Sequence, residues 1–211
     1  MVRDKPLPTE GLRKSERTRE SILDAARIAF ARKGFSGVNI RDIADLSGVT
    51  RANFYYYFRD KTELFIVLGT ATYRETLEVV EAFGEAIDGQ ERFHVHDWVN
   101  AYFDNLDRNG AFIIRSLEDA PEDRGFRTAV ARSHRRTATA LGDRIAKVAE
   151  TPPHCDAFAL GLAVMAMLER SWLMSQRKEI MSISKDVLVH AISELIGGLA
   201  HGYHHTKEHH V

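Results

Sequence analysis

Apolar residues recur at helical spacing along most of the chain. Between Ser15 and Gly34 they stand three and four positions apart, at Ile22, Ala25, Ala26, Ala29 and Phe30. This spacing predicts an amphipathic helix with one buried face. We expect Gly34 to end that helix, because glycine readily adopts the backbone conformation of a helix C-cap.

Two very short helices are predicted next, separated by Ser47-Gly48. Short polar residues that can cap helices stand at the expected places: Asn39 with Asp42 three positions later, Thr50, and Asp60 with Glu63 three positions later. The sequence therefore predicts a two-turn helix, a tight turn with glycine, another short helix, and then the start of a long one.

After Lys61 the predicted helices are longer. They cover residues 62–87, 93–106, 112–117, 123–148, 157–176 and 186–203. Breaks between them are indicated by Asp88-Gly89, Asn109-Gly110, Ala120-Pro121, Thr151-Pro152-Pro153 and the stretch from Ser182 to Ser184. No β-hairpin pattern competes, so the sequence predicts an all-α fold of about nine helices.

Charge is unevenly distributed along the 211 residues, whose net charge is −1. Residues 1–61 carry 13 Lys and Arg against 8 Asp and Glu, which is +5, and residues 62–211 carry 16 against 22, which is −6. This difference favours a basic N-terminal module that meets a polyanion and a larger acidic part that does not.

Composition indicates a globular, cytoplasmic protein. The chain is 44% hydrophobic and 28% charged, and its single cysteine, Cys155, excludes an internal disulfide framework. The N-terminus has no apolar signal region, and no uncharged apolar run is long enough to span a bilayer.

Five aromatic residues stand in a row from Phe54 to Phe58, and no helix can bury all five on one face. A helical wheel turns Phe54, Phe58 and Tyr57 toward the preceding helices. It turns an outward set toward solvent: Thr50, Arg51, Ala52, Tyr55 and Tyr56. The two outward tyrosines contribute little to stability, so they call for another explanation.

A short helix held behind another by a glycine turn is the layout of a helix-turn-helix, whose second helix enters the major groove of DNA. Tyrosine hydroxyls can donate to phosphate oxygens, and small Ala52 would allow close approach to the bases. Arg41, Arg51, Arg59 and Lys61 surround the aromatic run with positive charge. The alternative is a crowded turn in the core.

Residues 18–65, TRESILDAARIAFARKGFSGVNIRDIADLSGVTRANFYYYFRDKTELF, resemble the DNA-binding region of the tetracycline-repressor (TetR) family of bacterial transcription regulators. The resemblance covers nearly a quarter of the chain. It implies a homodimer with an N-terminal DNA-binding domain and a C-terminal ligand-binding domain, and repression that a small molecule relieves.

The resemblance also implies which residues contact the operator: Asn39, Arg41, Thr50, Arg51, Ala52, Tyr55, Tyr56 and Lys61. The family often has threonine where this chain has Asn39. Asparagine keeps the helix-capping role, but a hydroxyl contact to phosphate is then lost.

We expect three parts along the chain. Residues 1–17 form a flexible basic arm, residues 18–61 the helix-turn-helix domain, and residues 62–211 the ligand-binding and dimerisation domain. Such an arm can lie along DNA or in the minor groove, but it is more often disordered.

Two apolar segments, residues 155–174 and 184–203, are expected to pair two subunits. The second carries a wide stripe at Val187, Leu188, Ala191, Ile192, Leu195, Ile196 and Leu199, and Gly161, Gly197 and Gly198 would allow close backbone approach. The resemblance makes these segments a four-helix dimer seam. The alternative is that both are internal core.

The middle helices are expected to enclose an effector. The candidate ligand-binding residues are Trp98, Tyr102, Phe103, Phe112, Phe126, His134, Met165, Glu169 and Trp172. Many apolar groups with a few isolated polar ones favour an elongated, mostly apolar cavity. We expect an acyl or sterol-like effector, with multidrug-type binding as the alternative; plain core packing would explain any one of these residues.

Other classes of protein fit the sequence less well. It contains no nucleophile elbow, no phosphate-binding glycine loop and no zinc-protease motif, so we expect no enzyme and no cofactor. Histidines at residues 94–96 and 201–205 could suggest a metal, but exposed histidines near loops explain them better. A helical adaptor without specific DNA binding would leave the outward tyrosines unexplained.

Overall fold

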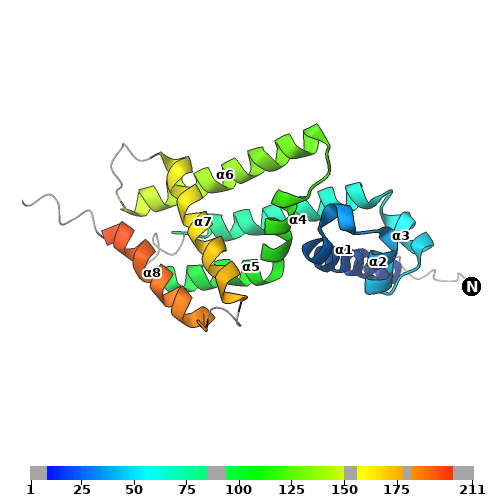
Figure 1. Cartoon of the computed structure of the whole chain (residues 1–211), viewed down its shortest axis with the longest axis horizontal. Helices are drawn as coiled ribbons and strands as arrows, with labels where there is room; N and C mark the ends of the chain where they lie inside the picture. Colours follow the sequence, from blue (N-terminus) through cyan, green and yellow to red (C-terminus); the bar gives the residue numbers. More distant parts are fainter. Residues whose placement is uncertain (1–8, 85–93, 150–155, 178–181, 202–211) are drawn as a thin grey trace, which may run out of the picture. The chain divides into compact units, whose positions relative to one another are not determined.

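The computed structural model describes residues 9–84, 94–149, 156–177 and 182–201 (Figure 1). These residues form eight helices and no strand, so the all-α prediction is confirmed with one helix fewer than expected. The helices are α1 Thr9–Gly37, α2 Ile40–Ser47, α3 Arg51–Tyr57, α4 Lys61–Glu81, α5 Val95–Glu118, α6 Arg124–Ala149, α7 Ala157–Ser175 and α8 Lys185–His201.

The chain divides into two compact units. Unit 1 comprises Met1–Thr70 and Ala111–Glu122, and unit 2 comprises Ala71–Gly110 and Asp123–Val211. The boundaries fall inside α4 and inside α5, so neither unit is a continuous stretch of sequence. The expected boundary at residue 61 does not coincide with this division.

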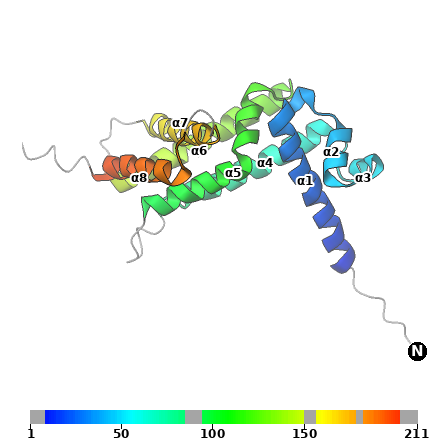
Figure 2. The same cartoon turned by 60° about the horizontal axis from the view of Figure 1, so that its bottom comes forward.

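Helix α1 begins at Thr9, so residues 9–17 are helical where we expected a flexible arm. Figure 2 shows these first turns projecting beyond α2 and α3. The segment lacks an apolar face, but its Leu, Arg, Lys and Glu residues have high helix propensity, which apolar periodicity does not detect. Gly34 interrupts the regular helix with φ 70°, as predicted, and the chain then resumes helical turns to Gly37.

The predicted caps of α2 and α3 are confirmed. The Asn39 side chain accepts from the backbone N–H of Asp42 at 2.9 Å, and the Asp42 carboxylate accepts from the backbone N–H of Asn39 at 3.1 Å. That backbone hydrogen bond, followed by the contact with Lys33, lowers the pKa of Asp42. Gly48 ends α2 at φ 69°, and Thr50 accepts from the N–H of Asn53 at 3.1 Å.

The core of unit 1 includes residues from the end of α5. The Phe65 ring lies 4.9 Å from Phe30 and 5.2 Å from Phe112, measured between centroids. The Asp119 carboxylate accepts from the Ser36 hydroxyl at 2.7 Å and from its backbone N–H at 3.1 Å, which lowers the pKa of Asp119. Residues 111–122 are therefore part of the N-terminal unit, although they lie far along the sequence.

Helices α6 and α7 of unit 2 pack backbone to backbone. A Cβ atom at Gly161 would collide with the Ala138 carbonyl oxygen, and one at Gly142 with that of Ala157. We expected Gly161 at a dimer seam, but it lies instead at the contact between α6 and α7 of one chain. A Cβ at Gly197 or Gly198 on α8, in contrast, would meet no described atom within 4 Å.

Helix α5 is continuous where a break was predicted at Asn109-Gly110. Gly110 is buried, and a Cβ there would lie 2.7 Å from the ring of Trp172 on α7. Asn109 is also buried and bonds to other side chains instead of ending the helix. These residues, which often form turns, serve here for a close helix contact and a buried polar network.

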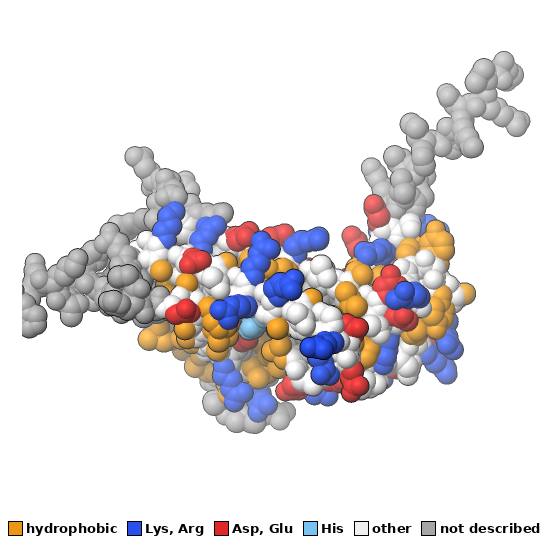
Figure 3. Space-filling model, turned by 90° about the horizontal axis from the view of Figure 1, so that it is seen from above, with side chains coloured by type: hydrophobic (Ala, Val, Ile, Leu, Met, Phe, Trp, Pro, Cys, Tyr) orange, Lys and Arg blue, Asp and Glu red, His pale blue; other side chains and the backbone are white. Residues whose placement is uncertain are grey.

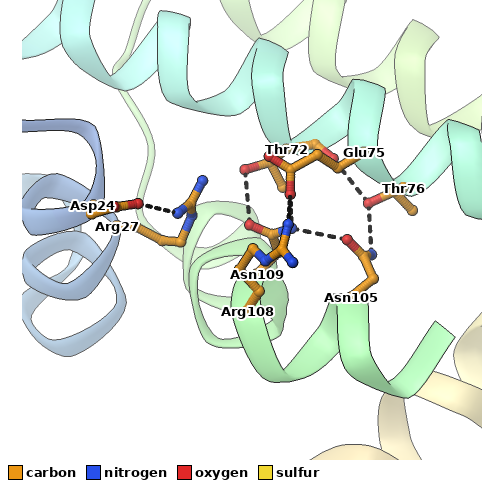
Figure 4. Close-up of polar contacts among 8 residues, drawn as sticks. All are labelled: Asp24, Arg27, Thr72, Glu75, Thr76, Asn105, Arg108 and Asn109. Atoms are coloured by element: carbon orange, nitrogen blue, oxygen red, sulfur yellow. Dashed lines mark hydrogen bonds and ion pairs between the residues drawn. The ribbon is translucent and has the colours of Figure 1, made fainter. Parts of the chain in front are cut away.

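That network joins α4 to α5 along a ladder of polar side chains (Figure 4). Its members are Thr72, Glu75 and Thr76 on α4 and Asn105, Arg108 and Asn109 on α5. Asn105 donates to Thr76 at 3.1 Å, and Asn109 donates to Glu75 at 2.9 Å. Because buried polar groups are costly when unpaired, this ladder favours one register between the two helices.

The other predicted boundaries have mixed outcomes. Helix α4 ends at Glu81, before residue 87, and a turn with Gly84 at φ 84° follows. Non-helical residues around Pro121 and at 182–184 confirm two breaks. The breaks predicted at Asp88-Gly89 and Thr151-Pro152-Pro153 lie outside the described residues.

Within the described part of the chain, α7 is the one helix that is long and apolar enough to cross a membrane by length and composition. Glu169 and Arg170 interrupt its apolar sequence, and 28% of the tested window is buried inside the chain. Helices that lie in protein cores pass the same test, so this property does not establish a membrane span.

Candidate DNA-binding surface and effector site

The row of five aromatic residues divides between the two sides of α3. Phe54 and Phe58 are buried in unit 1, whereas 48% of Tyr55 and 78% of Tyr56 is exposed. Tyr57 lies between these extremes, and its hydroxyl accepts from the Ser15 hydroxyl at 3.3 Å. The predicted directions of all five side chains are thus confirmed.

The exposed side of α3 continues toward its N-terminus. Thr50, Arg51 and Ala52 are all exposed, and Thr50 also caps the helix. Arg41 on α2 is exposed too, and its guanidinium lies 3.7 Å from Asp45. An arginine in such an exposed pair remains available to a stronger anion, because pairs of this kind contribute little free energy.

Lys61 differs from the other candidate contacts. Its ammonium donates to the backbone carbonyls of Phe35 at 2.8 Å and Val38 at 2.9 Å, and it lies 4.4 Å from the centre of the Phe35 ring. Two of its three N–H groups are therefore occupied inside unit 1. Phe35 lies in the last turn of α1 and Val38 just after it, where backbone carbonyls have no partner within the helix.

The aromatic candidates of unit 2 pack against one another. Trp98 is buried, its ring lies 5.4 Å from Tyr102 and 4.8 Å from Phe83, and its indole N–H donates to the Val79 carbonyl at 2.7 Å. Trp98 thus has the contacts of a satisfied core residue. Phe103 and Met165 are also buried in this unit.

Trp172 stands at a second polar contact in unit 2. Its indole N–H donates to the Asp107 carboxylate at 2.7 Å, and Lys185 donates to Asp107 at 2.8 Å and to Asp104 at 2.6 Å. Burial opposes charge on Lys185, but the bonds to the two carboxylates raise its pKa overall. The contact joins α5, α7 and α8.

Glu169 and Tyr102 carry polar groups of a different kind. Neither the Glu169 carboxylate nor the Tyr102 hydroxyl has a hydrogen bond or an ion pair with any described residue. Burial raises the pKa of Glu169 to about 7. Burial, and then the charge of Glu169, raises the pKa of Tyr102 well above its usual value.

The remaining ligand candidates are scattered. Phe112 belongs to unit 1, where it packs with Phe30 and Phe65, so it does not join the aromatic residues of unit 2. Phe126 and His134 are half-buried on α6, and burial lowers the pKa of His134. The sequence pattern could not assign these residues to one unit or the other. An apolar stripe identifies the buried face of a helix, but it does not identify the element that packs against that face.

Comparison with known proteins agrees with the geometry of unit 1. The family model of "Bacterial regulatory proteins, tetR family" matches residues 22–68, which include α2, α3 and the start of α4. The N-terminal part of the chain thus contains a TetR-family segment. Regulators of this family are cytoplasmic and are not enzymes, in agreement with both expectations from the sequence.

Curated relatives match a part of the chain. The chain is 41% identical over 51 residues to the transcriptional regulator AcrR of Shigella flexneri, covering 24% of each chain. It is 31% identical over 90 residues to the repressor AcnR of Corynebacterium glutamicum, covering 41% of this chain and 48% of that one. The matches thus span about a quarter to a half of these TetR-family relatives.

Solved structures extend the similarity of fold to most of the chain. A TetR-family regulator from Mesorhizobium loti has a TM-score of 0.65 at 16% identity, covering 89% of this chain and 97% of that one. The fatty acid degradation regulator FadR from Bacillus halodurans has a TM-score of 0.64 at 18% identity, covering 92% and 97%. At such identities the similarity concerns the fold alone.

Helix α6 qualifies the expectation that the C-terminal part avoids polyanions. It carries seven Lys and Arg against one Asp, and its exposed cations are Arg124, Arg127, Arg132, Arg135, Arg136 and Lys147. Figure 3 looks onto the side of Figure 1 where α6 lies and shows Lys and Arg gathered there. A net charge of −6 for residues 62–211 concealed this local excess.

Metal binding finds no support in the described residues, which contain no group of three His, Cys, Asp or Glu side chains that could hold an ion. His96 lies 3.6 Å from Asp97 and 3.2 Å from Asn100. The side chains of the histidines at positions 201–205 lie outside the described residues.

Proposed function

We propose that this chain is a TetR-family transcriptional regulator that binds a palindromic DNA operator as a homodimer and is released by a small, largely apolar effector. The observation that carries the proposal is the exposed side of α3, where Tyr55 and Tyr56 stand beside Arg51 without any role in the core. Solvent-exposed aromatic residues contribute little to folding, so a ligand for this surface explains them best.

The chemistry of that surface suits a DNA groove. Arg51 and Arg41 supply positive charge for phosphates, and the two tyrosine hydroxyls can donate to phosphate oxygens. Ala52 leaves space for close approach to base edges. Asn39 and Thr50 cap α2 and α3, so their contribution includes holding these helices in place.

Lys61 takes a modified role in this proposal. Because two backbone carbonyls hold its ammonium, one N–H remains for a phosphate. We therefore expect its substitution to weaken both the folding of unit 1 and operator binding. The tyrosines, in contrast, are expected to affect binding alone.

A homodimer would place two α3 helices in successive major grooves, about 34–36 Å apart. Helix α8 offers a surface for it, since 56% of Val187 and 59% of Leu195 is exposed, and Ala191 is exposed between them. These residues recur every four positions and form one apolar stripe. Gly198 on the same helix leaves space for a second backbone.

Effector release requires coupling between two sites. An effector that binds better to one placement of α4 would change the spacing of the two DNA-binding units and lower operator affinity. Linkage then requires that operator DNA weaken effector binding by the same factor. Equal effector affinities with and without operator would contradict this mechanism.

The decisive experiment for DNA recognition is a titration of the full chain with random duplex DNA, followed by sequencing of the bound fraction at two salt concentrations. We expect a palindromic site to be enriched at both. Weak binding that salt abolishes, with no enriched sequence, would favour the helical adaptor instead.

The proposed dimer is tested by light scattering of the same sample, which distinguishes dimer from monomer. Leu195→Glu should convert the protein to a monomer, whereas Glu194→Gln should leave it dimeric.

A further inference from the structure

Polar groups without a hydrogen-bond partner in the described chain occur inside unit 2, among them the hydroxyls of Tyr73 and Tyr102 and the carboxylate of Glu169. The last two lie on α5 and α7. Tyr102 on α5 is 0% exposed, yet its hydroxyl has no hydrogen-bond partner. Glu169 on α7 is half-buried and forms no hydrogen bond or ion pair with a described residue. Buried polar groups in folded proteins are nearly always paired, so each such group needs an explanation.

Polar neighbours of Tyr102 on α5 are paired. Asp107, on the same helix as Tyr102, accepts from Trp172 at 2.7 Å and from Lys185 at 2.8 Å. Asn105 donates to Thr76 at 3.1 Å. The fold therefore supplies partners for these two polar neighbours of Tyr102 on α5.

Tyr102 and Glu169 lie on two helices of unit 2 that contact each other, α5 and α7. The charge of Glu169 acts on the Tyr102 hydroxyl, as the raised pKa of Tyr102 reflects after burial itself. One turn beyond Glu169, Trp172 contacts α5 through Asp107 and at Gly110. Helices α5 and α7 are thus in contact one turn from Glu169 and five residues along α5 from Tyr102.

The surroundings define which ligand could satisfy both groups. A carboxylate only accepts hydrogen bonds, and a tyrosine oxygen can also accept one. The Trp98 ring lies 5.4 Å from Tyr102, and buried Met165 stands one turn before Glu169. An ammonium would bind the carboxylate through a charge-assisted bond and favour the aromatic faces, whereas a carboxylate ligand would be repelled.

We propose that Glu169 and Tyr102 form the polar end of the effector site and select an amphipathic amine, a molecule with an apolar body and one basic nitrogen. This inference rests on the proposed function, because it specifies the chemistry of the effector. The proposed effector has the apolar body that the sequence led us to expect. Its polar end is a cation, whereas a free acyl acid would carry a carboxylate there.

The test uses the full chain without DNA and three probes that share one apolar body: 4-phenylbutylamine, 4-phenylbutan-1-ol and 4-phenylbutyrate. The chain has two tryptophans, Trp98 and Trp172, and both lie in this region, so their fluorescence reports on it. Work at pH 8 keeps Glu169 ionised, since its pKa is about 7. We expect the amine to bind at least about tenfold more tightly than the alcohol, and the butyrate most weakly.

Variants separate the site from nonspecific binding. Glu169→Gln keeps the shape and removes the charge, so amine affinity should fall about tenfold while alcohol affinity stays the same. Tyr102→Phe should weaken the amine by a smaller factor. Glu78→Gln changes an exposed glutamate of the same unit and should leave all three affinities unchanged. Melting curves establish that each variant is folded.

Two results would overturn the inference: no saturable fluorescence change with the amine, or equal amine affinity in wild type and Glu169→Gln. Operator titrations on the same preparation keep the two proposals apart. Operator binding without amine binding would remove this inference alone. Amine binding without any change in operator affinity would keep the site and remove the proposed release mechanism.

Discussion

Tyr56 and Tyr102 have the same side chain and opposite environments. Tyr56 is 78% exposed on α3, and Tyr102 is 0% exposed on α5, where its hydroxyl has no partner. In the first case an apolar ring remains in water, and in the second a polar hydroxyl is removed from it. Both arrangements are unfavourable for the isolated chain, and we propose a ligand for each: DNA for the exposed ring and an effector for the buried hydroxyl.

Because their environments differ, the two tyrosines respond to different measurements. A residue on the surface of unit 1 can change binding without changing stability, because its hydroxyl makes no contact inside the chain. A residue in the interior of unit 2 changes stability first, because its surroundings were formed by folding.

The largest effect is expected for the double substitution Tyr55→Phe with Tyr56→Phe. Each hydroxyl that donates to a charged phosphate contributes about 1.5–3 kcal/mol, so operator affinity should fall about 100-fold or more. The melting temperature should stay the same. Tyr57→Phe is the matched control, since the Tyr57 hydroxyl bonds to Ser15 and its loss should affect stability slightly and binding little. Similar losses in both variants would contradict the assigned surface.

The next effect concerns the contact that positions α5 beside α7. In Gly110→Ala the new methyl group would meet the Trp172 ring at 2.7 Å, so we expect a loss of about 1–3 kcal/mol in the free energy of unfolding, measured in urea. Gly69→Ala is the control, because a Cβ atom there would meet no side chain or neighbouring element of the described chain within 4 Å. Its stability should be unchanged or higher, as alanine favours a helix over glycine. If the two variants had the same free energy of unfolding, the Trp172 ring would move aside for the methyl group without a measurable loss of stability.

A smaller effect of opposite sign is expected for Tyr102→Phe. Removing a buried, unpaired hydroxyl should raise the free energy of unfolding by about 1 kcal/mol, or the melting temperature by about 2–4 °C. Tyr56→Phe should leave the melting temperature unchanged. A clear loss of stability in Tyr102→Phe would mean that the hydroxyl is satisfied in solution, for example by a buried water.

The smallest effect is a pH-dependent one at Glu169. Burial raises its pKa from 4.5 to about 7, so the folded state holds a proton that the unfolded state releases. This side chain therefore lowers stability progressively as pH rises from about 4.5 to about 7. Glu169 is only half-buried, so solvent screens much of this effect. Glu169→Gln should therefore raise the melting temperature by only about 2 °C at pH 8 and by almost nothing at pH 4.5. A gain that does not vary with pH would exclude titration of this carboxyl as its cause.

Local sequence rules were sufficient for the helix-turn-helix. The caps at Asn39 and Thr50 depend on hydrogen bonds that span three residues, and the division of Phe54 to Phe58 depends on the helical period. Both are properties of a single helix and its ends. The prediction for residues 9–17 was wrong because their helix depends on propensity, and an apolar stripe is absent.

The grouping of the candidate effector residues could not be predicted from the sequence. Trp98, Tyr102 and Glu169 are in one unit, but Phe112 is in the other, and no periodic pattern distinguishes them. The bonds of Asp107 reach residues 65 and 78 positions away, so no local pattern indicated the pairing. A stripe of apolar residues identifies a buried face, whereas the identity of the partner helix depends on the fold.

By itself, the sequence determined the helical class, the capped helices α2 and α3, and the outward direction of Tyr55 and Tyr56, because these follow from interactions within a few residues. Only the tertiary structure decided that Gly110 continues a helix and that Lys61 is held by two carbonyls. It also decided that Tyr102 and Glu169 are left without partners among the described residues. Those outcomes depend on which distant segment lies against each residue, and short-range preferences contain no information about that choice.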